Sequence, residues 1–92
     1  MDNTAMDNKI IFERLVKILN EDLGVKTALG LNTALIREGI LDSMDFANYL
    51  TQVENSFNLR ISNEEVVEHE LGVVGNMVSF LARRSVSEVR NP

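Results

Sequence analysis

The hydrophobic positions near the start of the chain repeat with the period of an amphipathic helix. Between Asn8 and Leu23 they recur every three or four residues, and charged side chains occupy most of the other face. The apolar set is Ile11, Phe12, Leu15, Val16, Ile18, Leu19 and Leu23. Gly24 follows directly, and glycine commonly ends helices. The pattern therefore predicts a helix over residues 8–23, preceded by a flexible tail over residues 1–7.

The segment from Val25 to Leu41 is long for a connection, and its apolar residues have no sustained period. Loops of this length are uncommon unless they are functional or packed by their own side chains. The apolar content predicts a long first loop that lies on the core, with a short turn of helix over residues 33–37.

A second amphipathic pattern predicts a helix over residues 43–57. Phe46, Leu50, Val53 and Phe57 recur at helical spacing and define its buried face. Asp42 is a good N-cap, and Asp45 follows three residues later as in a capping box. The other side is expected to be exposed and mostly neutral, with Asn48, Tyr49, Thr51, Gln52, Asn55 and Ser56 on it.

Two further helices are predicted in the last third of the chain. Ser62 and Glu65 have the spacing of a capping box, which indicates a short helix over residues 63–69 with Val66 and Val67 as its apolar contacts. Gly72 separates it from a helix over residues 73–84. The buried face of that helix is formed by Val74, Met77, Val78 and Leu81.

These elements predict an all-α fold, a small up-down helical bundle of three longer helices and one short helix with a long first loop. The 92 residues allow one core, and 45% of them are apolar. We expect one domain over residues 8–84, flexible tails over 1–7 and 85–92, and a monomer. Phe46, Leu50 and Val53 should pack on the first helix, through Leu15 and Leu19, and on the last, through Val74, Met77 and Leu81.

Charge and composition exclude several classes of protein. A net charge of −5 argues against a nucleic-acid or anionic-membrane partner and suits partners with basic surfaces. The chain has no Cys, so it has neither a disulfide framework nor a thiolate metal site, and we expect a cytoplasmic protein. No apolar run is as long as a membrane span, and the polar N-terminus does not look like a signal peptide.

Ser43 is the residue whose position suggests chemistry. It opens the second helix beside free backbone N–H groups and the positive end of the helix dipole, a setting that favours an attached phosphate. A catalytic role is not indicated, because Ser43 is not in a G-x-S-x-G elbow and the one histidine, His69, lies in an acidic run where a solvated or ion-paired side chain is expected. No metal site is expected, because the run after Asp42 lacks the EF-hand ligand spacing.

The run Gly39-Ile40-Leu41-Asp42-Ser43-Met44-Asp45-Phe46, together with the order of helices, resembles the acyl carrier and peptidyl carrier protein family. The resemblance implies 4′-phosphopantetheine, taken from coenzyme A and attached to Ser43, and a protein that is not itself an enzyme. It implies Met44 as a partly exposed anchor for partners, with Asp42 and Asp45 beside it. The implied partners are a phosphopantetheinyl transferase, a ligase that loads an acyl or aminoacyl group as a thioester, and a downstream synthase or transferase.

The second helix departs from the strongly acidic one usual in fatty-acid carriers, since only Asp45 and Glu54 are acidic after Ser43. The Gly39–Met44 run is more similar to D-alanyl carriers and to discrete aminoacyl or peptidyl carriers, and the sequence leaves the cargo and pathway open. One alternative from another class also stays open at this point: a cofactor-free helical interaction module in which Ser43 is only part of a helix cap.

Overall fold

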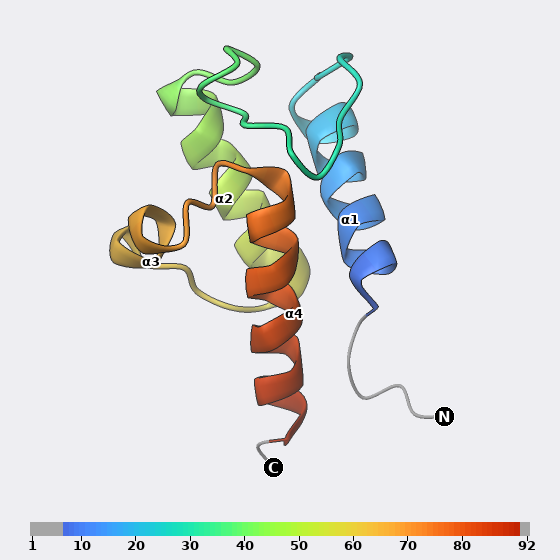
Figure 1. Ribbon diagram of the computed structural model, residues 1–92, viewed down its shortest axis with the longest axis vertical. Coiled ribbons are helices and arrows are strands. Elements are labelled where there is room, and N and C mark those ends of the chain that lie inside the picture. Colours follow the sequence, from blue (N-terminus) through green and yellow to red (C-terminus); the bar gives the residue numbers. More distant parts are fainter. Residues whose placement is uncertain (1–6, 91–92) are drawn as a thin grey trace.

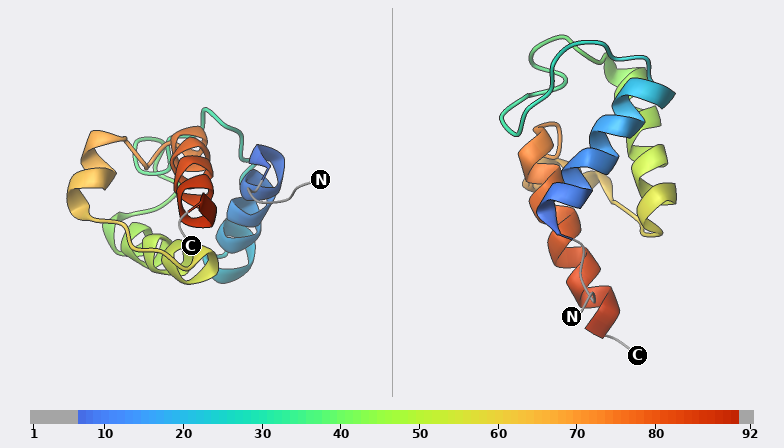
Figure 2. Two further views of the ribbon diagram at one scale, coloured as in Figure 1. Left: turned by 90° about the horizontal axis from the view of Figure 1, so that it is seen from below. Right: turned by 90° about the vertical axis from the view of Figure 1, so that its right-hand side faces the viewer.

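The computed structural model describes residues 7–90, with side chains over residues 7–84. Its helices are α1 (Asn8–Lys17), the π-helical turn η1 (Ile18–Asp22), α2 (Ser43–Phe57), α3 (Asn63–Glu68) and α4 (Val74–Arg90). α1 runs antiparallel to both α2 and α4 (Figure 1), and α4 lies between α1 and α3 (Figure 2). The described residues contain no β-strand, which confirms the all-α prediction. None of their helices is both long and apolar enough to cross a membrane.

The first predicted helix is confirmed over nearly its whole length, but its last turn is wider than an α-helix. Val25 N–H donates to the Leu19 carbonyl at 2.9 Å as the chain leaves η1. Gly24 follows with a φ of +71°, a left-handed conformation that glycine adopts at low cost. Asp7 was predicted to lie in the tail, but its side chain caps α1 by accepting from Lys9 N–H at 3.1 Å. Residues 1–6 of the predicted tail lie outside the described residues.

The core is aliphatic apart from two buried aromatic residues, Tyr49 and Phe80. The residues predicted to pack between the first and last helices are largely confirmed, since Leu15, Leu19, Val53, Val74, Met77 and Leu81 are all fully buried. The prediction for Tyr49 is wrong: its side chain is fully buried rather than exposed. Phe46, Leu50 and Phe57 are only half-buried at the edge of the core. Tyr49 lies three residues after Phe46 and four before Val53, so the same helical spacing places it at the centre of the buried face.

The long loop is attached to the start of α4 by backbone hydrogen bonds. Val74 N–H donates to the Thr33 carbonyl at 3.0 Å, and Gly75 N–H donates to the Leu31 carbonyl at 2.8 Å. The first N–H groups of a helix have no partner within the helix, so the loop carbonyls satisfy them. The turn of helix predicted over residues 33–37 does not extend into a helix: Glu38 N–H donates to the Ala34 carbonyl at 2.9 Å, one helical-type bond within a run of turns over residues 35–39. Leu35 N–H donates across the loop to the Gly72 carbonyl at 2.8 Å.

The capping box of the short helix α3 is confirmed. Glu65 N–H donates to Ser62 Oγ at 3.1 Å, and Ser62 N–H donates to Glu65 Oε1 at 2.9 Å. Arg84 ties α3 to α4 through an ion pair with Glu65 at 3.5 Å. Val66 packs at the edge of the core, but Val67 is 77% exposed, so its predicted core contact is wrong.

α4 continues to Arg90, six residues beyond its predicted end at Arg84, and residues 91–92 lie outside the described residues. No Gly or Pro interrupts residues 76–91, so nothing in the local sequence stops the helix earlier. The domain limits of 8–84 and the flexibility of the ends stay predictions.

Candidate functional site

Ser43 is the first residue of α2, as predicted, and its side chain is exposed. Asp42 has extended backbone angles and caps the helix, because its Oδ1 accepts from Asp45 N–H at 2.8 Å. This cap uses the third N–H of the helix and leaves those of Ser43 and Met44 without an intrahelical acceptor. An anion attached to Ser43 would therefore meet two N–H donors and the positive end of the helix dipole.

The approach to Ser43 is fixed by a tight turn in the loop. Gly39 has a φ of +75°, and the N–H groups of Ile40 and Leu41 both donate to the Leu35 carbonyl, at 2.9 and 3.0 Å. Leu41 is then buried one residue before Asp42. The buried side chain of Leu41 and the cap formed by Asp42 fix the backbone just before Ser43. The exposed hydroxyl of Ser43 is therefore held at a defined place on the surface.

Met44 and Asp45 are exposed next to Ser43. The Met44 side chain is 80% exposed, which removes it from the core and leaves a flexible apolar group in solvent. Asp45 borders a hollow of about 400 Å³ whose other walls are residues 23–27 and 38–41. Asp42, Ser43, Met44 and Asp45 thus lie together at the end of the bundle where the long loop enters α2.

Other polar groups of the described chain show no catalytic arrangement around Ser43. His69 is half-buried, with its ring 5.5 Å from that of Phe80. Burial raises the pKa of Tyr49 well above its usual value, so its hydroxyl stays protonated. Within residues 7–84, no three His, Asp or Glu side chains cluster in a way that could hold a metal ion.

With this geometry in place, comparison with known proteins identifies the class. The family model for the phosphopantetheine attachment site matches residues 13–88, so the chain belongs to the phosphopantetheine-binding carrier protein family. It is 29% identical over 89 residues to an acyl carrier protein of Saccharopolyspora erythraea, covering 90% of this chain and 94% of that protein. Acyl carrier proteins of an Arthrobacter species and of Paenarthrobacter aurescens are each 34% identical over 76 residues, which cover 82% of this chain and 91% of theirs. No solved structure matches the chain significantly.

The protein is therefore a carrier that bears a phosphopantetheine arm. Proteins of this class are not catalysts; a phosphopantetheinyl transferase modifies them, and enzymes of a pathway use them. The family match removes the alternative of a cofactor-free interaction module. The residues present also fit the group, since the described chain offers an exposed serine hydroxyl beside free N–H donors at a helix start.

Proposed function

We propose that Ser43 is the residue that carries the arm, through a phosphodiester on its Oγ. The observation that carries this proposal is the placement of Ser43: an exposed hydroxyl on the first residue of α2, after a capping aspartate that leaves two N–H groups free. The family match spans this position, and the surrounding Gly39–Phe46 run has the pattern expected of an attachment motif.

In the attachment reaction, the carrier supplies only the attacking hydroxyl. Ser43 Oγ forms a bond to the phosphorus at the pantetheine end of coenzyme A, the bond from that phosphorus to the bridging oxygen breaks, and adenosine 3′,5′-bisphosphate leaves. The hydroxyl proton goes to a base of the transferase. The two free N–H groups then stabilise the negative charge of the phosphodiester. The arm supplies a thiol on which an acyl group is held as a thioester.

Asp42, Met44 and Asp45 form the proposed docking surface for partner enzymes. Met44 offers an exposed, polarizable side chain that can adapt to an apolar recess on different partners. The carboxylates of Asp42 and Asp45 stand on either side of the modified residue, and the net charge of the chain is −5. Partners with a basic rim around an apolar recess would be attracted and oriented by this arrangement.

We infer a small or specialised acyl or aminoacyl cargo, loaded by a dedicated ligase in the cytoplasm and passed to a downstream synthase or transferase. The exposed side of α2 is largely neutral, with Asn48, Thr51 and Asn55 on it. Between the helices, large side chains such as Tyr49 and Met77 are fully buried. An aminoacyl group would stay in solvent, because burying an unpaired ammonium group is costly.

Intact mass after incubation with a phosphopantetheinyl transferase and coenzyme A tests the assignment. The wild-type chain should gain one phosphopantetheine, and Ser43→Ala should gain none while keeping its helical content, because Asp42 still supplies the cap. Ser56→Ala, an exposed serine at the other end of α2, is the matched control and should be modified normally. Modification of Ser43→Ala at another residue would overturn the proposal.

A further inference from the structure

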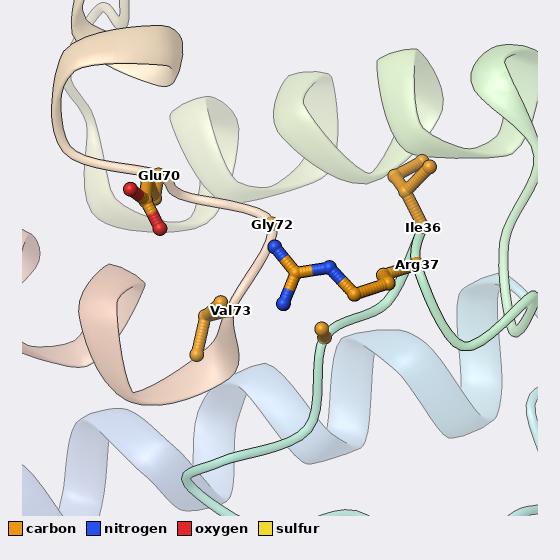
Figure 3. Close-up of a pocket in the computed structure, with 6 residues that line it drawn as sticks. Ile36, Arg37, Glu70, Gly72 and Val73 are labelled. Atoms are coloured by element: carbon orange, nitrogen blue, oxygen red, sulfur yellow. The ribbon is translucent and has the colours of Figure 1, made fainter.

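A pocket of about 330 Å³ opens between the long loop and the connection from α3 to α4. It is lined by Ala34, Ile36, Arg37, Glu70, Gly72 and Val73 (Figure 3). The two walls are joined by the bridge between Ala34 and Val73 and by the hydrogen bond from Leu35 N–H to the Gly72 carbonyl. These backbone bonds make the pocket a fixed feature of the fold rather than a gap between independent loops.

The pocket brings a cation and an anion together without pairing them. The guanidinium of Arg37 extends across the pocket toward Gly72, and the carboxylate of Glu70 lies on the far side (Figure 3). Among residues 7–84, whose side chains are described, neither group forms an ion pair or a side-chain hydrogen bond. The pocket thus offers unused N–H donors from Arg37, unused carboxylate acceptors from Glu70, and the apolar side chains of Ile36 and Val73 as part of its lining.

This lining suits a neutral group with a donor and an acceptor of its own. A secondary amide has both, a carbonyl for Arg37 and an N–H for Glu70. A purely anionic ligand would be repelled by Glu70, and a purely cationic one by Arg37. Both side chains are exposed, so water competes for these hydrogen bonds and a free amide would bind weakly. A ligand tethered nearby escapes that limit, because tethering gives it a high effective concentration.

The place where such a tether would begin lies close to the pocket. Leu35 links the two: its N–H bonds to Gly72 in the pocket wall, and its carbonyl accepts from Leu41 N–H at 3.0 Å. Leu41 stands two residues before Ser43, a stretch of chain that spans at most about 7 Å. One residue therefore separates the pocket wall from the segment that leads into α2.

We propose that this pocket receives the amide-bearing part of the protein's own phosphopantetheine arm. Arg37 donates to an amide carbonyl of the arm, Glu70 accepts from an amide N–H, and the methylene groups lie on Ile36 and Val73. This proposal rests on the attachment of the arm to Ser43. It gives the arm a resting place along the loop, with its thiol end directed away from the Met44 surface until a partner withdraws it.

Backbone amide chemical shifts of the apo and holo proteins test the proposal, with each sample first checked for complete modification by intact mass. Holo-minus-apo differences should appear at Ala34, Gly72 and Val73 in the wild type. Arg37→Ala and Glu70→Ala should each lose more than half of these differences. Arg83→Ala removes another exposed arginine, on α4 and outside the pocket, and should retain them.

The outcomes separate this proposal from the one on which it rests. Full modification at Ser43, with shift differences confined to the residues around Ser43, would overturn the pocket proposal and leave the attachment site intact. Pocket shifts that persist unchanged in both Arg37→Ala and Glu70→Ala would overturn the amide contacts. Absence of any mass increment would overturn the attachment to Ser43 itself.

Discussion

The rings of Phe46 and Tyr49 pack against each other on the buried face of α2, with their centroids 5.7 Å apart and their planes tilted by 41°. Tyr49 is fully buried by this contact and by the surrounding core, and within the described residues its hydroxyl finds no hydrogen-bond partner. A buried hydroxyl without a partner costs about 1–3 kcal/mol.

Tyr49→Phe should therefore stabilise the protein, because it keeps the ring packing and removes the unpaired hydroxyl. We expect an increase of about 1 kcal/mol in the free energy of unfolding, measured by urea denaturation. Tyr49→Ala, which empties the site, should instead cost about 3–5 kcal/mol. A clear loss of stability in Tyr49→Phe would show that the hydroxyl is bound, for example by a buried water molecule.

Gly75→Ala should detach the long loop from α4. A Cβ at this position would lie 2.7 Å from the Leu31 carbonyl oxygen, a backbone atom that already accepts from Gly75 N–H. Relieving the clash breaks that hydrogen bond, and we expect a loss of about 1–3 kcal/mol. For a domain of this size, each kcal/mol lowers the melting temperature by about 4–8 °C.

Gly72→Ala is the matched control for that substitution, because nothing lies within 4 Å of a Cβ there and its backbone is not left-handed. Its melting temperature should stay close to that of the wild type. Equal losses in the two variants would mean that the loop is not held at Gly75.

Met44→Ala and Asp45→Arg should slow modification by the transferase several-fold without unfolding the protein. The first removes exposed apolar surface, and the second replaces attraction for a basic partner with repulsion. Initial rates of arm transfer measure the effect, and circular dichroism checks the helices. Asp22→Arg, an exposed charge reversal at the end of η1, should be modified at the wild-type rate. If both Met44→Ala and Asp45→Arg keep that rate, partners dock elsewhere.

Lowering the pH should loosen α3 before the rest of the bundle. The hydrogen bond from Ser62 N–H, with a smaller contribution from Arg84, lowers the pKa of Glu65 below its usual value of 4.5. A carboxylate with a lowered folded pKa stabilises the fold above its unfolded pKa, and that stability is lost as pH falls through the folded pKa. The protection factors of the amides in residues 63–68, which correct for the slower intrinsic exchange in acid, should fall below about pH 4.5. Glu65→Gln keeps a side-chain acceptor but cannot titrate there, so its α3 should lack this component of the pH dependence.

Local patterns determined most of the helical architecture from the sequence. The start of α2 follows from Asp42, whose side chain bonds to a backbone N–H only three residues away. The capping box of Ser62 and Glu65 and the stop at Gly24 are equally local. The exposed position of Ser43 follows from the same helix start. Such features are predictable because the interacting groups are fixed by spacing along one segment.

Tertiary packing decided the rest. The helical spacing of α2 is compatible with a buried Tyr49, but packing decides that Tyr49 is fully buried while Phe46 and Leu50 lie at the edge of the core. The long loop is held on the start of α4 by backbone hydrogen bonds to Gly72, Val74 and Gly75, far along the chain. Arg37 and Glu70 likewise share a pocket only after that docking has occurred. The sequence does not predict that these two residues share a pocket. The hydrogen bonds that bring them together join two segments that are separated along the chain by α2 and α3.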